Sequence, residues 1–313
     1  MMVYTAKRLM MLIPILIGVS ILAFLIMHLI PGDPARVIAG MGASPEDVEG
    51  IRQRLGLDRP IHVQYFEFMR GIAQGDLGNS IRTRRPVLTE MLDRYPATIN
   101  LGGAALAVGV LIGVPAGVVA AVKQYSAFDS MSMMVAIFGL SMPSFWMGLM
   151  LVYFLGYRLE LLPPSGMLGS PWTWDGMRSL LMPAFTLGTP TAAVLARLSR
   201  SSMLEVVRQD YIRTARAKGL KEAIIVLRHA LKNALIPVIT VAGMQLGYLL
   251  GGAVVVETVF AWPGLGRLVV SAIHFRDFPV VRGGVMLFAL TFVLVNLLVD
   301  LAYGMVDPRI RYA

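Results

Sequence analysis

Residues 209–237 read QDYIRTARAKGLKEAIIVLRHALKNALIP, a basic, helix-forming segment between two long apolar runs. A Lys or Arg at the centre of a bilayer helix costs about 2.5–3.5 kcal/mol, so this segment cannot lie in hydrocarbon. It must project into water from a protein whose neighbouring segments are apolar. Two interpretations stay open at this point: a structured arm on which another protein acts, or a solvated loop that obeys the charge rule for cytoplasmic segments.

The composition of the chain is that of an integral membrane protein. Hydrophobic residues occupy 56% of the 313 positions, charged residues only 15%, and the mean hydropathy is +0.68. A soluble chain carries about 25% charged residues. There is no cysteine, which excludes disulfides and thiolate metal sites. The sequence also has no Gly-Lys pair and therefore no phosphate-binding loop, so any ATP that drives this protein must be hydrolysed by another chain.

The net charge of +9 is concentrated on particular loops. Residues 197–235, here called the basic arm, hold nine Lys or Arg and three acidic residues, a balance of +6. In residues 31–96, nine Arg and nine acidic residues cancel. This distribution reflects membrane topology and predicts no nucleic-acid partner.

Six apolar runs predict an all-α fold with six transmembrane helices, because about 20 residues cross the hydrocarbon core. The runs are 9–30, 98–122, 131–156, 180–196, 236–256 and 283–303. The first follows Lys7 and Arg8, is too long for a signal-peptide core and predicts a retained anchor. With the N-terminus inside, all five lysines fall on the cytoplasmic side: Lys7, Lys123, Lys218, Lys221 and Lys232. Both termini are then cytoplasmic.

These spans divide the chain into an anchor (1–30), an extracytoplasmic helical cap (31–97), a five-span core (98–303) and a cytoplasmic tail (304–313). In the cap, Ser44 is the expected N-cap of a helix whose apolar face is Val48, Ile51 and Leu55, with Gly56 as its stop. Further amphipathic helices are expected over 61–73 and over 86–95, the latter ending before Pro96. The alternative is a connector without fixed structure.

Two spans carry small residues at intervals of four, a pattern that lets helices approach closely in lipid. They are Gly109, Gly113 and Gly117, extended by Ala105, and Gly243, Gly247 and Gly251. Packing inside one bundle and packing against a second membrane chain both fit this pattern.

The middles of the predicted spans contain no Asp, Glu, Lys or Arg, and Asp300 lies at the inner end of the last. Proton-driven carriers need buried ionisable relays, so this absence argues against secondary active transport. There is no His-Glu-x-x-His pair, and the four histidines are scattered. We expect neither a catalytic residue nor a metal site in this chain.

Within the basic arm, Asp210 is the expected N-cap of a short helix that begins at Tyr211 and stops at Gly219 in a left-handed conformation. Eight residues are too few to be helical alone in water, so the helix must dock on something. Ala215 and Ala217 keep it narrow enough to enter a cleft. A second helix is expected from about Lys221 to Leu235, returning to the membrane before Pro237.

The arm resembles the cytoplasmic coupling loop of ABC-importer permeases in the dipeptide/oligopeptide/nickel family. The general form of that loop is Glu-Ala-Ala, three residues, Gly, nine residues, Ile-x-Leu-Pro. Aligned on Gly219, Arg213 replaces the Glu, Thr214 replaces the first Ala, Ala215 matches the second, and His229 replaces the Ile. Other motifs that carry the resemblance are HLIPGDP (28–34), GDLGNS (75–80), MPSFW (142–146), ETVFAWPGLG (257–266), RDFP (276–279) and DPRIR (307–311).

The resemblance implies that the chain pairs with a homologous permease, that two ABC ATPase subunits bind ATP and Mg beneath them, and that an extracytoplasmic binding protein delivers the cargo. It implies ATPase-coupling roles for Asp210, Tyr211, Arg213, Thr214, Ala215, Gly219 and His229. As candidates for the cargo path we select four polar or adaptable residues, Ser141, Met142, Gln245 and Tyr248.

The pattern is closest to the first permease subunit of dipeptide or glutathione importers in a bacterial inner membrane. Alternatives are the same machine importing nickel chelates, a proton-coupled carrier, and a scaffold or receptor that transports nothing.

Overall fold

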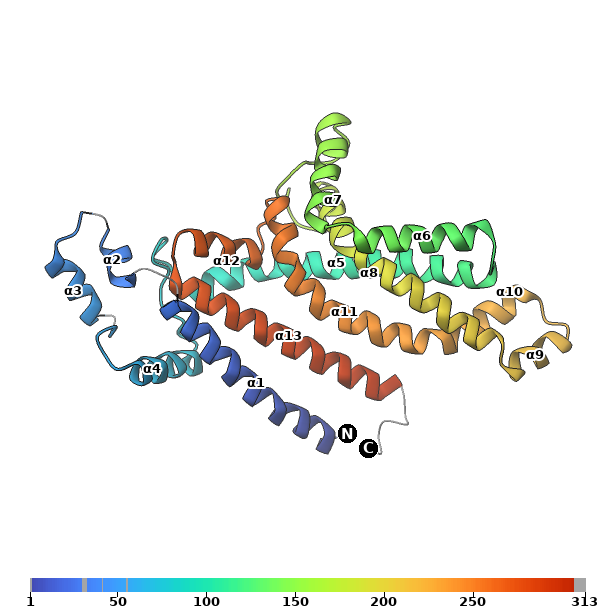
Figure 1. Cartoon of the computed structure of the whole chain (residues 1–313), viewed down its shortest axis with the longest axis horizontal. Coiled ribbons are helices and arrows are strands. Elements are labelled where there is room, and N and C mark those ends of the chain that lie inside the picture. The colour runs from blue at the N-terminus through green and yellow to red at the C-terminus, as the bar shows by residue number, and fades with distance from the viewer. Residues whose placement is uncertain (1, 30–32, 41, 55, 307–313) are drawn as a thin grey trace. The chain divides into compact units, whose positions relative to one another are not determined.

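The computed structural model of the protein describes residues 2–29, 33–40, 42–54 and 56–306 (Figure 1). Three predicted features lie partly or wholly outside them: Leu55 of the predicted cap helix, residues 30–32 of the HLIPGDP motif, and the DPRIR motif of the tail. Within the described residues every regular element is a helix, apart from one isolated bridge between Asn79 and Pro86. The chain forms two compact units.

The first unit comprises the residues up to Ala97 together with Pro263–Leu294. Its helices are α1 (Met2–Leu29), α2 (Pro34–Ala39), α3 (Pro45–Arg54), α4 (Ile61–Gln74), the beginning of α5 (Val87–Val122), α12 (Leu265–His274) and the beginning of α13 (Phe278–Val306).

Local sequence signals account for the helices of the predicted cap. The Ser44 hydroxyl accepts a hydrogen bond from the Asp47 N–H while the Asp47 carboxylate accepts one from the Ser44 N–H, so the predicted N-cap is confirmed as a reciprocal cap. Gly56 follows α3 at φ +65°, the left-handed stop expected there. The predicted helix over 61–73 is confirmed as α4, which packs on α1 through the rings of Phe24 and Tyr65, 5.4 Å apart.

The predicted third cap helix is wrong. Instead of ending before Pro96, α5 runs without interruption from Val87 to Val122, so this helix and the second predicted span are one element. A proline removes only one backbone hydrogen bond, and packing within a membrane protein tolerates that loss.

The remaining part of the first unit has an apolar core and a polar clasp. Val87 and Met91 of α5 pack against Leu265 of α12 and Val280 of α13. Beside them the Asp277 carboxylate is buried in the loop at 80–82, where the Ile81 and Arg82 N–H groups and the Ser80 hydroxyl all donate to it. The loop before α5 is therefore tied to the turn between α12 and α13.

The second unit comprises Thr98–Trp262 and the end of α13. After α5 come α6 (Ala127–Ser141), α7 (Ser144–Leu151), the π-helix η1 (Val152–Arg158), α8 (Trp174–Val207), α9 (Asp210–Ala217), α10 (Glu222–Ile224), the π-helix η2 (Ile225–Ala230) and α11 (Leu231–Val259). The most extensive packing is between α8 and α11.

The first glycine stripe packs inside this unit. A Cβ added at Gly113 would lie 2.3 Å from the Ala192 carbonyl oxygen, and one at Gly117 would lie 2.2 Å from that of Ala196, so α5 and α8 touch backbone to backbone. The second stripe is mixed: Gly243 meets Val299 of α13, whereas a Cβ at Gly251 would meet open space. Packing within one bundle thus explains the first stripe and only part of the second.

Four described helices are long and apolar enough to cross a membrane: α5, α8, the continuous α10–η2–α11 and α13 up to Val299. A fifth crossing results if α6 and α7–η1 count as one span, although they are bent by 102° at Met142–Pro143. The described part of α1 contributes a shorter apolar helix, Met10–Leu25.

Three predicted boundaries need correction. The run at 131–156 is broken at Pro143, whose ring cannot continue the preceding helix. The short run at 180–196 lies within the 34-residue α8, which continues through Pro183 and Pro190. The second arm helix does not end before Pro237, because η2 leads directly into α11.

Candidate functional site

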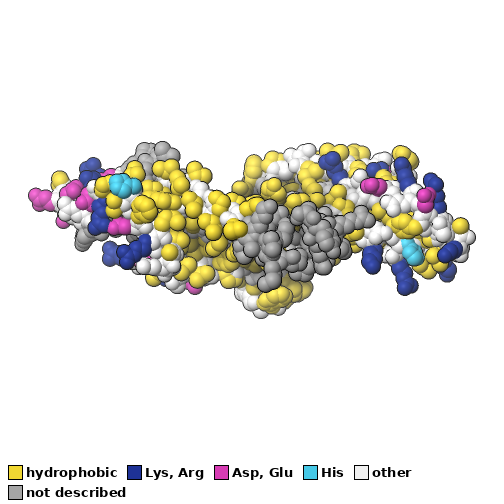
Figure 2. All heavy atoms as spheres, turned by 90° about the horizontal axis from the view of Figure 1, so that it is seen from below, with side chains coloured by type: hydrophobic (Ala, Val, Ile, Leu, Met, Phe, Trp, Pro, Cys, Tyr) yellow, Lys and Arg dark blue, Asp and Glu magenta, His cyan; other side chains and the backbone are white. Residues whose placement is uncertain are grey.

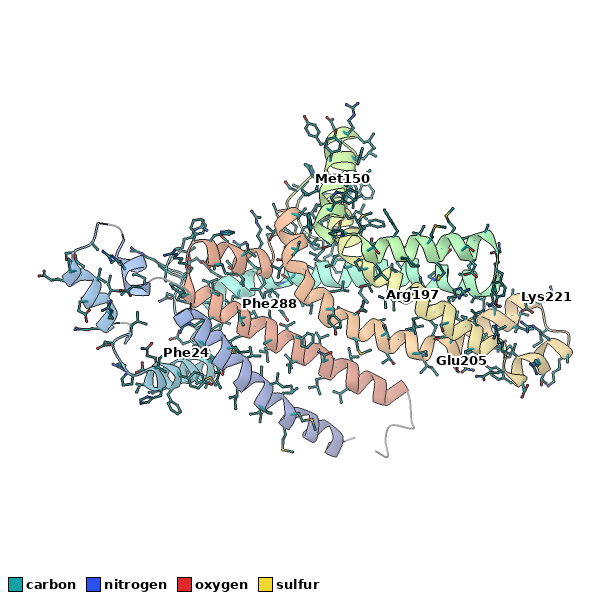
Figure 3. All side chains as sticks on the ribbon, viewed as in Figure 1. Phe24, Met150, Arg197, Glu205, Lys221 and Phe288 are labelled. Atoms are coloured by element: carbon teal, nitrogen blue, oxygen red, sulfur yellow. The ribbon has the colours of Figure 1, made fainter. Side chains whose placement is uncertain are left out.

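The basic arm of the structure consists of the end of α8, then α9, α10, η2 and the first turn of α11. Figure 3 labels Lys221, which lies between α9 and α10. The short helix of the arm, α9, begins one residue earlier than predicted. Gln209 is its N-cap residue, with extended backbone, and Asp210 is its first helical residue. Asp210 therefore acts as an acidic residue in the first turn, where it favours the helix dipole, and the predicted capping role is wrong.

The stop of α9 agrees with the prediction. Gly219 has φ +76°, and its N–H donates to the Arg216 carbonyl at 2.9 Å. A Cβ at this position would meet nothing within 4 Å. The requirement for glycine is thus one of backbone conformation and not of space.

One face of α9 is buried against its own chain. Ile212 is 0% exposed and Ala215 is 8% exposed. They belong to an apolar cluster, here called the arm core, with Ala121, Met203, Val206, Ile225, Val226, Ala230 and Ala234. These residues come from α5, α8, η2 and α11, so an eight-residue helix that is unstable alone is held by four other elements.

The opposite face of α9 is polar and open. The Arg213 side chain is 74% exposed, its ion pair with Asp210 is on the surface, and Thr214 donates back to the Asp210 carbonyl. Lys and Arg side chains gather over this end of the second unit (Figure 2). The exposed Lys and Arg of the basic arm are Arg197, Arg208, Arg213, Arg216, Lys218, Lys221, Arg228 and Lys232.

Two polar contacts close the arm onto its own base. The Tyr211 hydroxyl accepts a hydrogen bond from the Asn233 amide at 2.7 Å, which joins α9 to α11. Arg216 donates twice to the Glu222 carboxylate, at 2.6 and 3.2 Å, and this raises the pKa of the Arg216 guanidinium. The arm is thus a rounded, preformed projection rather than a loose loop.

The predicted coupling residues divide between these two faces. Asp210, Tyr211, Arg213, Thr214 and Gly219 are exposed, whereas Ala215 points into the arm core and His229 is half-buried on η2. The idea that Ala215 narrows the helix for entry into a cleft is not what the geometry favours, because its side chain packs against its own chain.

Sequence reasoning missed Ile212. Its position one turn before Ala215 was a signal for a shared face, but it could not tell whether the chain itself or a partner covers that face.

The four path candidates lie at the end of α6, in the break before α7, and on α11. Ser141 is the last residue of α6, and its hydroxyl donates a hydrogen bond to the Ile137 carbonyl. Met142 lies in the break before α7. Gln245 of α11 reaches Thr191 of α8 at 3.5 Å, and Tyr248 is 69% exposed.

Two buried polar pairs were also missed. Glu257, in the last turn of α11, is fully buried and accepts a hydrogen bond from Thr98 at 2.6 Å. Asp129 of α6 is held by the Arg200 guanidinium of α8 through two hydrogen bonds. Both pairs join helices within the second unit. In the described residues no group of three His, Cys, Asp or Glu side chains is placed to hold a metal ion.

Long apolar helices and a preformed basic projection characterise the second unit. Residues 113–312 match the sequence profile described as "Binding-protein-dependent transport system inner membrane component", and residues 1–102 match the profile of its N-terminal region. The chain therefore belongs to the family of inner-membrane permeases of binding-protein-dependent transport systems. It is a permease subunit and not itself an enzyme.

Named relatives are similar along the whole chain. The dipeptide transport system permease protein DppB of Alkalihalophilus pseudofirmus is 46% identical, with 100% of both chains covered. DppB of Escherichia coli is 44% identical over 100% of this chain and 99% of its own. The glutathione transport system permease protein GsiC of Escherichia coli is 45% identical, with both chains fully covered.

Solved structures support the fold. The inward-facing MetNI methionine ABC transporter matches with a TM-score of 0.58 at 18% identity, covering 69% of this chain and 96% of that one. An amino acid ABC transporter matches with a TM-score of 0.54 at 14% identity, covering 69% and 94%. The described residues, which form helices as their regular elements, have the fold of ABC-importer permeases.

Proposed function

We propose that this chain is one of two homologous permease subunits in an ATP-driven importer of dipeptides, oligopeptides or glutathione. Two ATPase subunits that bind ATP and Mg lie beneath the permease pair, the basic arm of this chain is its contact with them, and an extracytoplasmic binding protein delivers the cargo. The relatives named for dipeptide and glutathione transport, at 44–46% identity over the full length, support this substrate class. The alternative cargo is a nickel chelate.

The proposed topology has six spans: α1, α5, the bent α6–α7–η1 unit, α8, α11 and α13. Both termini lie in the cytoplasm, and α2–α4 form a cap on the outer face. The distribution of lysine supports this orientation, because all five lysines then lie inside. In functional terms residues 1–30 are the anchor, 31–97 the cap, 98–303 the core and 304–313 the tail.

The single observation that carries the coupling role is the two-faced α9. Ile212 and Ala215 fix the helix to the arm core, while Tyr211, Arg213 and Thr214 present a polar face to solvent. A force applied to the exposed face is transmitted through a packed cluster to α5, α8 and α11. We therefore assign contact with the ATPase to Asp210, Tyr211, Arg213, Thr214 and Gly219, and support of that surface to Ala215 and His229.

Coupling requires that ATP binding favour one of two arrangements of the spans. Closure of the ATPase pair shifts the arm core, and the path between the two permeases opens outward. Ser141, Met142, Gln245 and Tyr248 remain our candidates for lining that path, in which uncharged walls leave selectivity to the binding protein.

The decisive experiment is uptake by proteoliposomes that hold the assembled transporter and its binding protein. Labelled dipeptide, glutathione and Ni²⁺ chelate are compared with and without ATP. We expect ATP-dependent accumulation of a peptide. Accumulation of nickel alone would reassign the cargo, and accumulation without ATP would overturn the proposal in favour of a secondary carrier.

Gly219→Pro tests the coupling role within that assay. Proline cannot adopt φ +76° and lacks the N–H that bonds Arg216, so the stop of α9 is lost. Gly219→Asn is the matched control, because asparagine tolerates the left-handed conformation and a Cβ there meets open space. We expect ATP hydrolysis without uptake for the first variant and near-normal uptake for the second. Normal uptake by Gly219→Pro at normal membrane levels would refute the coupling role.

A further inference from the structure

The first unit contains two neighbouring hollows that both have walls from α1, α4 and α13. The outer pocket, of about 260 Å³, is lined by Phe24, Phe68 and Arg282 among others. The apolar groove, of about 380 Å³, is lined by residues that include Ile13 and Leu290. Adjacent residues of one helix line different hollows, since Phe68 and Arg282 face the pocket whereas Met69 and Gly283 face the groove.

The outer pocket contains an arginine cation for which the described residues supply no anion. The Nε atom of Arg282 is buried and has no hydrogen-bond partner among the residues that the structure describes. Its guanidinium lies over the Phe68 ring, 4.9 Å from the centroid, which offers cation–π attraction but no acceptor. The acidic residue of the pocket, Glu67, is already ion-paired with Arg59. A buried, unsatisfied donor with a positive charge favours an anionic ligand.

The groove has the opposite chemistry. Its walls come from Ile13, Leu16 and Ile17 of α1, Met69 and Ile72 of α4, and Met286, Leu287 and Leu290 of α13. The Ile13 and Ile17 side chains are exposed in this single chain, so the groove is open to the surrounding solvent or lipid. Phe24, labelled in Figure 3, lies at the outer-pocket end of α1 and contacts Phe68.

The distance along α13 between the two hollows matches the length of one lipid molecule in a single leaflet. From Arg282 to Leu290 the helix rises by about 12 Å, because each residue adds 1.5 Å. One leaflet of the hydrocarbon core is about 15 Å thick. An anionic group held at Arg282 is therefore placed at the membrane interface while a hydrocarbon chain attached to it fills the groove.

We propose that the first unit binds one anionic phospholipid, with its phosphate on the Arg282 guanidinium and an acyl chain in the groove between α1, α4 and α13. In the orientation proposed above the lipid belongs to the outer leaflet, but the binding itself does not depend on the transport function. The lipid joins the anchor helix and α4 to α13, because all three helices line both hollows.

The test uses the assembled transporter purified in detergent and titrated with phosphatidylglycerol, with native mass spectrometry counting the lipids that stay bound to this chain. Arg282→Gln removes the charge, and we expect binding at least about tenfold weaker, the loss of a charge-assisted hydrogen bond. Arg70→Gln, an exposed arginine on α4, is the matched control and should bind as the wild type does. Ile13→Trp fills the groove and should also weaken binding while the charge is intact.

Each outcome decides between sources of the ligand. Equal competition by inorganic phosphate, unaffected by Ile13→Trp, would show a free-anion site and overturn the lipid proposal. Equal binding by Arg282→Gln and Arg70→Gln would overturn it as well. If crosslinks from Ile17 reach the second permease and the assembled transporter keeps no lipid here, the groove is a subunit interface and the proposal is wrong. Retention of phosphatidylglycerol over phosphatidylcholine by Arg282→Lys, but not by Arg282→Gln, would support it even if the folded yield of one variant falls.

Discussion

Ile212→Ala is the sharpest test of how the basic arm is held. Ile212 is fully buried in the arm core, and α9 has only eight residues with which to remain helical. Truncation of a buried Ile to Ala typically costs about 2–5 kcal/mol, the sum of the lost transfer free energy and the cavity. Because α9 is unstable alone, most of this cost falls on the docking of α9 and less on the spans.

Even the lower bound of about 2 kcal/mol predicts a large increase in the rate of proteolysis of α9. A loss of about 2 kcal/mol raises the population of undocked α9 by about 30-fold. Trypsin cleavage after Arg213 and Arg216 follows that population when opening and closing are fast. The assay is limited proteolysis of the chain in lipid nanodiscs without ATPases, followed by uptake and ATP hydrolysis in the assembled transporter.

The matched control is Ile224→Ala, in the same arm, because the Ile224 side chain is exposed and its truncation leaves no cavity. We expect about 30-fold faster cleavage and a lower ratio of uptake to hydrolysis for Ile212→Ala only. Equal cleavage rates for the two variants would show that the arm core does not hold α9, and the proposed route of force from α9 to the spans would fail with it.

Two further predictions concern close contacts, one within each unit. Gly117→Ala should destabilise the second unit by about 1–3 kcal/mol, because its Cβ would lie 2.2 Å from the Ala196 carbonyl and α5 must move away from α8. Gly103→Ala on the same helix, with nothing within 4 Å, is its control, and equal unfolding midpoints in detergent would contradict the close approach. Asp277→Asn should lower the free energy of unfolding of the first unit by about 1–3 kcal/mol, since the amide replaces one of the two acceptor oxygens with an NH2 donor. The exposed Asp93→Asn is the comparison, and a change of the same size there would disprove the clasp.

The buried polar pairs refine the argument from missing charges. The predicted spans are uncharged at their centres, yet α11 extends to Val259 and so includes Glu257, and α13 begins at Phe278 and so includes Arg282. Glu257 accepts a hydrogen bond from Thr98 within its own unit, which is the behaviour of a structural group. Arg282, without such a partner among the described residues, is the group for which a ligand is the better explanation.

Features that depend on neighbouring residues could be predicted from sequence. The Ser44 cap, the left-handed Gly56 and Gly219, the α4 helix and the approximate extent of α9 all follow from side-chain hydrogen bonds and backbone sterics over a few residues. Composition determined the membrane class, and the ordered motifs determined the family, because both are properties of the chain written out in one dimension.

Features that depend on which surfaces meet could not be predicted. Proline signals stop helices in water, but Pro96 and Pro190 lie inside continuous helices because packed neighbours offset the lost hydrogen bond, while Pro143 bends its span by 102°. A glycine stripe marks a close approach without naming the partner, and only the fold shows that Gly113 meets Ala192. For the same reason, the sequence could not show which face of α9 is buried. Helical spacing puts Ile212 and Ala215 on one side, but only tertiary packing decides that the chain itself buries that side and leaves the other to be touched.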